Sequence, residues 1–217
     1  MKLNGKLALL FVILLPLSFY IYFEIKKSKT GIRLKKLPVL SQTVIPDFTL
    51  VLHNLDTLTE KDVEGKIVVS DFFFTRCRGI CPVMGRNMRK LQDYILRNDN
   101  LQSEFLLLSH TVDPYHDTVN VLNDYAQAYG ADGKLWLLAT GNKAQLYDLA
   151  INFYKLPALE TPEDTSNLYT HSERFTLVDK EGYIRGYYDG TDSVSIKQLM
   201  KNIVDLDLSY KLDKKSP

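Results

Sequence analysis

The chain has 217 residues, a length that suits one domain of ordinary size with a tail and that can bury a substantial core. Hydrophobic residues make up 45% of the chain and charged residues 24%, which argues against a disordered protein. Residues 1–36 hold eight of the 27 basic residues and one of the 26 acidic residues, so residues 37–217 carry 19 basic and 25 acidic residues and a net charge of −6. An acidic body argues against nucleic acid as a partner.

The N-terminus contains an apolar segment. After Lys2 and Lys6, the 17 residues LALLFVILLPLSFYIYF fill positions 7–23 without a charge. At about 1.5 Å per residue, a helix of this length spans about 26 Å, the short end for a bilayer core. The segment is apolar on every face and no small-x-small cleavage site follows it. We therefore predict an uncleaved single-pass membrane anchor over residues 1–23, with a cleaved signal peptide as the alternative.

The orientation of this anchor is ambiguous. Six positive residues lie between residues 26 and 36, within a basic linker that we predict over residues 24–44, against two before the apolar segment. The positive-inside rule alone favours a cytoplasmic domain. The site chemistry described below favours a domain outside the cytoplasm. We predict the second arrangement, a cell-membrane protein whose soluble domain is extracytoplasmic, in the periplasm.

Residues 45–210 alternate between strand and helix patterns and end before a polar tail over 211–217. The run IVVSDFFF in residues 67–74 is typical of a central strand buried on both faces. Pro82 stands where the first residue of the next helix is expected. Strands are expected at 47–52, 67–74, 105–109, 135–139, 175–178 and 183–188, with helices over 82–98, after Asp117, around Leu146 and around Leu199. This order, βαβ followed later by ββα with a helix pair inserted, predicts an α/β domain of the thioredoxin-like fold.

The chain has two cysteines, Cys77 and Cys81, in the sequence CRGICP between a predicted strand and a predicted helix. A disulfide across so short a loop stabilises little, so the pair is better explained by chemistry than by structure. Backbone N–H groups and the positive end of a helix stabilise a thiolate, the form that attacks disulfides and binds metals. The neighbouring Arg76 and Arg78 add positive charge. We therefore expect thiolates at this turn.

Two thiolates leave a metal site incomplete, and histidine is the usual further ligand. The chain has four histidines, His53, His110, His116 and His171. Because most histidines in proteins are not ligands, position alone selects none of them.

Three segments resemble the Sco/SenC family and follow one another in the family's order. FFFTRCRGICPVMGRNMRKLQ is similar to the family's FFxTxCxxxCPxM segment. SHTVDPYHDTVNVLNDYAQAYG is similar to its S-x-DP-x-x-DT segment, and HSERFTLVDKEGYIRGYYDG to the segment that opens with a ligand histidine. With IPDFTL and LWLLATG, the resemblance covers about residues 45–206. The chain departs from the family where Tyr115-His116 replaces a frequent Glu-Arg and Arg78-Gly79 a common Pro-Thr.

The resemblance implies a copper protein. Carried over by position, Cys77, Cys81 and His171 bind copper, as Cu(I) or Cu(II), and the two cysteines can form a redox disulfide. The family role implied is that of a metallochaperone for the CuA centre of cytochrome c oxidase, with subunit II of the oxidase as partner, acting by copper delivery or by thiol reduction. The ligand set agrees with this, since two thiolates and one imidazole suit Cu(I), whereas structural zinc normally takes four protein ligands.

The main alternative is a membrane-anchored thiol-disulfide oxidoreductase without copper. Such reductases use C-x2-C and a cis-Pro before a later strand, whereas this chain has C-x3-C and no nearby Pro before Phe175. A peroxiredoxin needs P-x3-T-x2-C, and here Thr75 is two residues before Cys77. A domain with an incidental disulfide leaves His171 unexplained. We therefore expect no enzymatic activity beyond thiol-disulfide exchange.

Other conspicuous residues have simpler interpretations. Asp113 before Pro114 fits a turn, and Asp117 fits a helix N-cap. The aromatic residues 72–74 and the pair Met84 and Met88 match buried positions, so they are predicted to be core rather than copper ligands.

Overall fold

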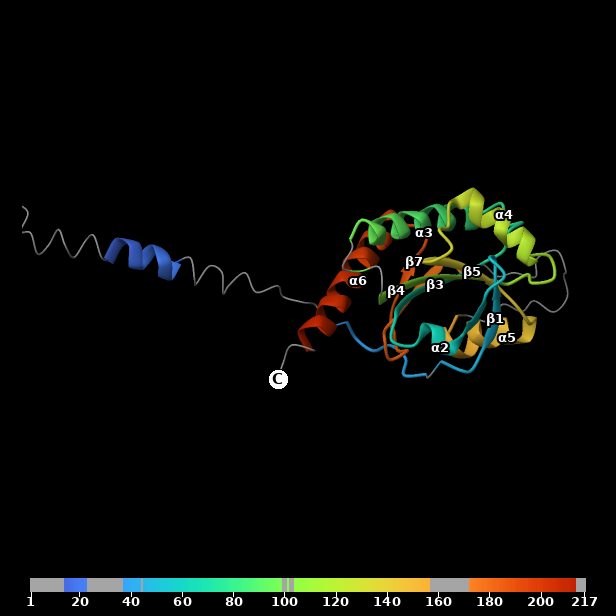
Figure 1. Cartoon of the computed structure of the whole chain (residues 1–217), viewed down its shortest axis with the longest axis horizontal. Coiled ribbons are helices and arrows are strands. Elements are labelled where there is room, and N and C mark those ends of the chain that lie inside the picture. Colours follow the sequence, from blue (N-terminus) through green and yellow to red (C-terminus); the bar gives the residue numbers. More distant parts are fainter. Residues whose placement is uncertain are drawn as a thin grey trace, which may run out of the picture. The chain divides into compact units, whose positions relative to one another are not determined.

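The computed structural model describes residues 14–22, 37–43, 45–98, 101, 104–156 and 172–213. The chain divides into two compact units, Met1–Lys35 and Lys36–Pro217. In the first unit, the described residues form a helix over 14–22, inside the predicted anchor, and the rest of that anchor lies outside the described residues (Figure 1). Among the residues described, no helix has both the length and the apolarity required to span a bilayer. The single-pass anchor stays a prediction.

The second unit is built on a sheet whose strands have the order β2-β1-β5-β4-β3-β6-β7. Strands β3, β4 and β5 are parallel, while the other pairings are antiparallel. The strands are β1 (Thr49–Leu52), β2 (Thr57–Thr59), β3 (Ile67–Phe73), β4 (Phe105–Thr111), β5 (Trp136–Thr140), β6 (Arg174–Val178) and β7 (Ile184–Asp189).

Helices cover both faces of this sheet (Figure 1). Residues of α3, α4 and α6 share one hydrophobic layer, which also holds both cysteines and which we call the cysteine layer. Residues of α2, α5 and the π-helix η2 share the second layer, on the opposite face. The helices are α2 (Glu60–Val63), α3 (Cys81–Leu96), α4 (Val119–Tyr129), α5 (Lys143–Asp148), η2 (Leu149–Phe153) and α6 (Ser193–Asp213).

Strand alternation divides the core between the two layers. In β3, Val69 and Phe73 belong to the cysteine layer, whereas Val68 and Phe72 belong to the second layer. Every residue of β3 is buried, as predicted for a strand covered on both faces. Met84 and Met88 are also buried, on the inner face of α3, which confirms their prediction as core residues.

The arrangement agrees with the mixed α/β architecture predicted from the sequence. Strand β3, helix α3 and strand β4 form a parallel βαβ unit, and β6, β7 and α6 form the later ββα unit. In the sheet, β6 pairs with β3, so the two units join edge to edge. The insertion between them contains α4, β5 and α5 with η2. The carboxyl end of β3, where a ligand site is expected in α/β folds, therefore opens into the turn that carries Cys77.

The hairpin between β6 and β7 is held by a buried carboxylate. The side chain of Asp179 accepts hydrogen bonds from the backbone N–H groups of Glu181, at 3.0 Å, and Tyr183, at 2.7 Å, and it pairs with Arg185. Gly182 has a φ of +83°, a conformation that favours glycine. The predicted hairpin is confirmed, and Asp179 accounts for its geometry.

The packed unit extends beyond both ends of the segment 45–210. Before it, Leu37 is buried, its carbonyl oxygen accepts a hydrogen bond from Arg185 at 2.9 Å, and Ser41 forms a β-bridge with Ile184. After it, α6 continues to Asp213. The last residues of the predicted linker therefore contact the domain.

Candidate functional site

The two cysteines lie at the junction of β3 and α3. β3 ends at Phe73 and α3 begins at Cys81, so Cys77 lies in the intervening turn. The backbone N–H of Cys77 donates to the Phe74 carbonyl oxygen at 3.2 Å. Cys77 is 7% exposed, Cys81 is 3% exposed, and both are free thiols. Pro82 follows within the first turn of the helix, as predicted. The C-x3-C motif thus occupies the predicted strand-to-helix turn.

Burial determines the protonation of Cys81. The pKa of the Cys81 thiol is raised well above its ordinary value. Desolvation is the largest cause, and the hydrogen bond with Cys77 is the second. The expectation that the helix start and the flanking arginines produce a thiolate is therefore wrong for Cys81. Its side chain belongs to the core beneath α3, where the cost of burying a charge outweighs those contributions. Without metal, Cys81 carries a proton at neutral pH, and binding a cation there must displace it.

A carboxyl group lies in the same layer, and sequence reasoning missed it. Asp71 is 3% exposed in β3, with its side chain on the side of Val69 and Phe73, and Oδ1 has no hydrogen-bond partner among the described residues. Burial raises the pKa of Asp71 to about 7. A negative charge on Asp71 also helps to raise the pKa of Cys81. The available signal was a single charged residue within the nearly continuous apolar run IVVSDFFF.

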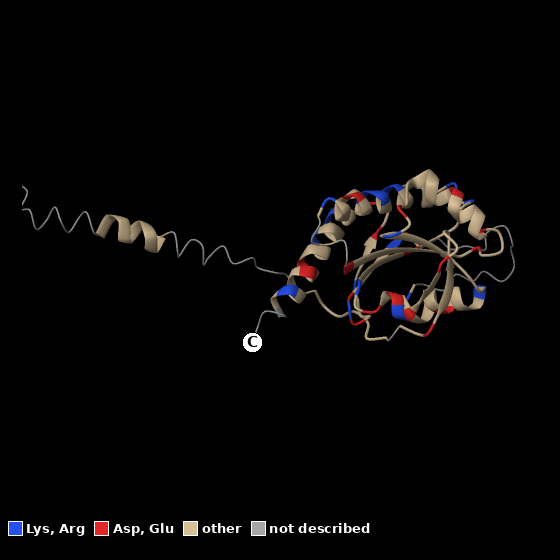
Figure 2. Ribbon diagram, in the orientation of Figure 1, with Lys and Arg blue, Asp and Glu red and all other residues tan. Residues whose placement is uncertain are grey.

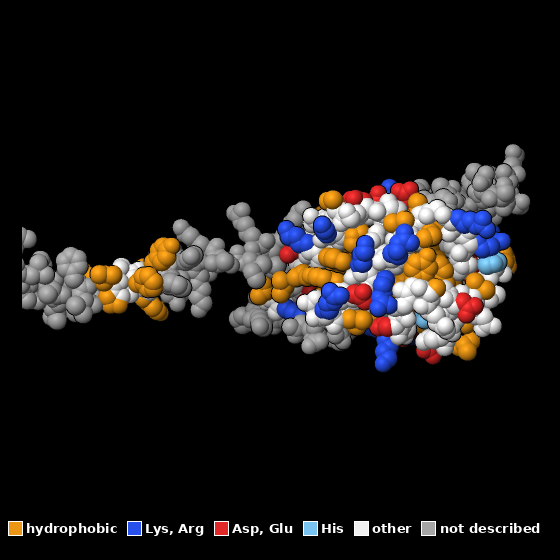
Figure 3. All heavy atoms as spheres, turned by 90° about the horizontal axis from the view of Figure 1, so that it is seen from above, with side chains coloured by type: hydrophobic (Ala, Val, Ile, Leu, Met, Phe, Trp, Pro, Cys, Tyr) orange, Lys and Arg blue, Asp and Glu red, His pale blue; other side chains and the backbone are white. Residues whose placement is uncertain are grey.

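The outer surface beside this turn is basic, although residues 37–217 are acidic in total. Arg76 and Arg78 are exposed in the turn, and α3 exposes Arg86, Arg89 and Lys90. Figure 2 shows Lys and Arg positions along α3, and Figure 3 shows Lys and Arg side chains with hydrophobic side chains between them on that face. None of these basic side chains is among the groups that shift the pKa of Cys81.

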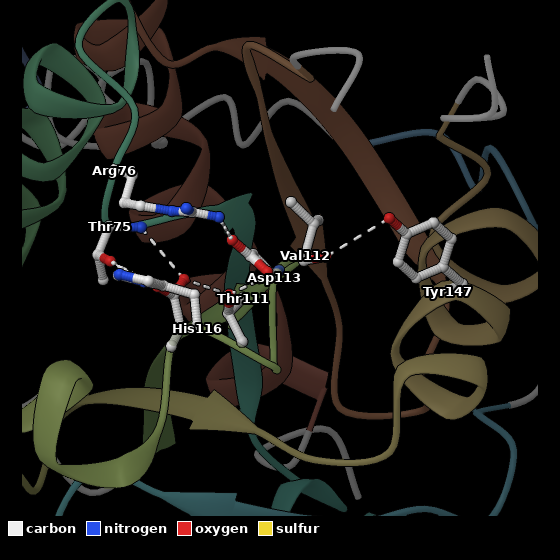
Figure 4. Close-up of polar contacts among 8 residues, drawn as sticks. Thr75, Arg76, Thr111, Val112, Asp113, His116 and Tyr147 are labelled. Atoms are coloured by element: carbon white, nitrogen blue, oxygen red, sulfur yellow. Dashed lines mark hydrogen bonds and ion pairs between the residues drawn. The ribbon is translucent and has the colours of Figure 1, made fainter. Parts of the chain in front are cut away.

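The segment that follows β4 holds the cysteine turn from one side (Figure 4). The carboxylate of Asp117, whose side chain is 0% exposed, accepts hydrogen bonds from the Thr75 backbone N–H at 3.1 Å, the Thr75 hydroxyl at 2.5 Å and the Thr111 hydroxyl at 2.5 Å. The prediction that Asp117 caps a helix is wrong. The N-cap of α4 is Thr118, and Asp117 instead connects the ends of β3 and β4.

Asp113 makes a second connection to the same turn. Its carboxylate pairs with Arg76 Nη2 at 2.6 Å, and its backbone N–H donates to the Thr111 hydroxyl at 2.9 Å. Its carbonyl oxygen accepts hydrogen bonds from the backbone N–H groups of His116 and Asp117, at 3.1 and 2.8 Å, which confirms the predicted turn. In the sequence, only the turn was visible, because Arg76 lies far from Asp113 along the chain.

Ligand atoms of Asp113, His116 and Asp117 lie within 4.8 Å of one another. His116 Nδ1 is 2.9 Å from Asp117 Oδ1. Both carboxylates, however, already accept hydrogen bonds from Thr75, Arg76 or Thr111. We therefore assign this cluster to holding the turn rather than to metal binding.

The histidines fall into different places. His171, the predicted third copper ligand, lies outside the described residues. His110 lies within β4, not after it, and its ring stacks on Phe72 at 4.7 Å in the second layer. Burial lowers the pKa of His110 to about 3. The sheet separates His110 from the cysteines, which removes it as a substitute for His171.

His53 also has a structural role. Its Nδ1 accepts a hydrogen bond from the backbone N–H of Leu138 at 3.2 Å, and burial lowers its pKa. This contact joins the end of β1 to β5, away from the cysteine turn.

Comparisons with known proteins identify the family of this chain. The model of the SCO1/SenC family matches residues 39–206. A putative copper-binding protein of Stutzerimonas stutzeri is 32% identical over 148 residues, which cover 67% of this chain and 69% of the relative. An SCO1 protein homolog of Bacillus subtilis is 24% identical over 160 residues, covering 73% of this chain and 80% of the relative.

Solved structures show the same fold. A SCO1/SenC family lipoprotein of Bacillus anthracis superposes with a TM-score of 0.67 at 25% identity, covering 75% of this chain and 94% of that one. Arabidopsis thaliana ScoI with copper bound gives a TM-score of 0.61 at 24% identity, covering 77% and 99%. The family match spans more than half of the chain and includes both cysteines, so the chain belongs to the SCO1/SenC family.

Proposed function

We propose that this protein binds copper through Cys77, Cys81 and His171 and serves the assembly of the CuA centre of cytochrome c oxidase. The observation that carries the proposal is the pair of free, buried thiols at the strand-to-helix turn of a SCO1/SenC chain. The relative from Stutzerimonas stutzeri is named a putative copper-binding protein. Solved relatives from Arabidopsis thaliana and yeast contain copper.

The donor set fits copper as a cargo. Two sulfur ligands and one imidazole match the preference of Cu(I) for soft, low-coordinate sites, and the same set can hold Cu(II). Cys77 and Cys81 are close enough to hydrogen-bond, so both sulfurs can turn toward one ion. The buried thiol of Cys81 loses its proton on binding copper, while the core around it excludes water from the site.

Copper delivery is the function that we favour, and thiol-disulfide exchange is the second candidate. The hydrogen bond between Cys77 and Cys81 favours the second as well, because sulfurs in contact can form a disulfide while reducing a disulfide in a target protein. A disulfide switch is described for the relative BsSco. In such an exchange, two electrons and two protons pass from the thiols of Cys77 and Cys81 to the target, which becomes a dithiol.

We further propose that the domain lies outside the cytoplasm and is held at the membrane by residues 1–23. A solved relative from Bacillus anthracis is called a lipoprotein, which supports a membrane-associated setting. A reporter fused to the C-terminus tests the topology. An extracytoplasmic signal supports the proposal, and a cytoplasmic signal would mean that the basic residues after the apolar segment set the orientation.

The function is tested with the full chain in detergent. Cu(I) affinity is measured by competition with a chromophoric chelator, and Cu(II) binding by absorption spectroscopy. The copper-loaded protein is then mixed with the CuA domain of oxidase subunit II, and copper transfer is followed separately from reduction of a CuA-domain disulfide. Transfer without reduction supports delivery, and reduction without transfer supports the second candidate. If the protein shows no transfer and no reduction, both candidate functions are overturned.

A further inference from the structure

We propose that Asp117 is a positioning residue for the copper site, whose buried carboxylate fixes the turn that presents Cys77. The inference rests on the proposed function, because it names a residue that sets the geometry of the same ligands. Nothing in the sequence places Asp117 beside the cysteines, since Thr75 is 42 positions away.

The first step is the set of contacts around the Asp117 carboxylate. Each of its oxygens has two polar neighbours: Oδ2 accepts from the Thr75 N–H and the Thr111 hydroxyl, while Oδ1 accepts from the Thr75 hydroxyl and lies 2.9 Å from His116 Nδ1. The side chain is 0% exposed. Hydrogen bonds to an ionised acceptor are the strong ones, and a buried carboxylate depends on them. These contacts therefore hold the Asp117 carboxylate in one position.

The second step is the position of Thr75 in the chain. β3 ends at Phe73, so the backbone N–H of Thr75 has left the sheet and is satisfied by Asp117. Two residues later comes Cys77, whose own N–H donates to Phe74. Holding Thr75 by both its backbone and its side chain fixes the direction in which the turn leaves the strand. The orientation of Cys77 follows from that direction.

The third step separates Asp117 from its neighbour Asp113. Asp113 pairs with the side chain of Arg76, which is 58% exposed and connects to the backbone through a long flexible stem. A partly exposed ion pair of this kind contributes little. Asp117 holds the main chain itself, so it has the larger influence on the sulfur ligand.

A buried carboxylate elsewhere in the fold provides the matched control. Asp179 is also 0% exposed, and its carboxylate accepts hydrogen bonds from two backbone N–H groups in the hairpin after β6, whereas that of Asp117 accepts from one. In the sheet, Val178 at the end of β6 pairs with Val68 near the start of β3, whereas the cysteine turn follows the other end of β3. Asp117 and Asp179 therefore share burial and a carboxylate bonded to the main chain, but not proximity to the cysteines.

The test compares Asp117→Asn and Thr75→Val with Asp179→Asn and with Thr75→Ser, which keeps the hydroxyl. Thermal unfolding, Cu(I) affinity and the Cu(II) absorption spectrum are measured for each full-length variant. We expect Asp117→Asn and Thr75→Val to shift the Cu(II) spectrum and weaken Cu(I) binding about tenfold, the scale for residues that orient ligands. Thr75→Ser should match the parent. Asp179→Asn should lower the unfolding temperature and leave the spectrum unchanged.

The outcomes separate this inference from the proposed function. If Asp117→Asn and Thr75→Val each bind Cu(I) and Cu(II) like the parent, the positioning role is overturned. If Asp117→Asn does not fold, the uncharged change Thr75→Val decides. If the parent itself binds no copper, the proposed function fails, and the turn is tested by the rate at which Cys77 reacts with a small aromatic disulfide. A changed rate in Asp117→Asn with a parental rate in Asp179→Asn then supports positioning, and equal rates in all three reject it.

Discussion

The two faces of the sheet both bury titratable groups, but with opposite consequences. In the cysteine layer, burial raises the pKa of Asp71 to about 7, so its charge changes near neutral pH. In the second layer, His110 is enclosed by Phe72 and Tyr154, and burial lowers its pKa to about 3, so it stays neutral. The comparison teaches that burial alone does not mark a site. What distinguishes the cysteine layer is the turn after β3, which carries Cys77 and leads into Cys81.

The largest expected effect breaks the comparison directly. Cys77→Ala or Cys81→Ala should abolish tight Cu(I) binding, because each removes one of two sulfur ligands, and His171→Ala should weaken binding and shift the Cu(II) spectrum. His110→Phe should bind copper like the parent, because His110 lies on the other face of the sheet. Competition with a Cu(I) chelator measures all four. Loss of copper in His110→Phe, at a parental unfolding temperature, would contradict the assignment of the two faces.

The second prediction concerns Asp71→Asn and stability. The pKa of Asp71 is about 7 in the fold, against an ordinary value of 3.8, so the folded state holds the proton more tightly. The stability that this tighter proton binding contributes is fully present below pH 4 and is lost as pH rises through 7. The loss is on the order of 4 kcal/mol, at about 1.4 kcal/mol per pKa unit.

The change Asp71→Asn should remove this loss. The difference in unfolding free energy between variant and parent should then grow from pH 4 to pH 8 in favour of the variant. Urea unfolding at several pH values measures it. A difference that is the same at pH 4 and pH 8 would mean that Asp71 is ionised at both values in the folded parent.

The sequence predicted much of the fold because its signals were local. The apolar run of β3, the helical spacing of Met84 and Met88 and the hairpin at 179–182 each lie within a few residues, and each was confirmed. The same holds for the placement of the C-x3-C motif between a strand and a helix.

The parts that failed depend on distant packing. The cap assigned to Asp117 was wrong because its partners Thr75 and Thr111 come from the ends of two other elements. The expected thiolate at Cys81 was wrong because burial beneath α3 is set by the whole core. A strand buried on both faces also hides its alternation, so the side of the sheet that His110 faces could not be read from β4. His171 rests on the family resemblance.

The third prediction sharpens the role of the buried thiol. Because the pKa of Cys81 is raised, its proton is present throughout the neutral range and copper must displace it. Cu(I) affinity should therefore increase with pH, by about tenfold per pH unit for each proton released. Chelator competition at pH 6, 7 and 8 measures the slope. An affinity that does not change with pH would mean that the ligands are already thiolates before copper binds.

The smallest expected effect concerns Arg76→Gln, on the rim of the cysteine layer. Arg76 is 58% exposed and pairs with Asp113 at 2.6 Å, so solvent screens most of the attraction. We expect the free energy of unfolding to fall by less than about 1 kcal/mol, the range measured for exposed ion pairs. The Cu(II) spectrum should not change, because Asp117 continues to hold Thr75. Urea unfolding and absorption spectra of the variant measure both quantities, and Arg78→Gln is the control for loss of one exposed charge in the same turn. A spectral shift in Arg76→Gln but not in Arg78→Gln would show that the ion pair, as well as the hydrogen bonds between Thr75 and Asp117, fixes the position of Cys77.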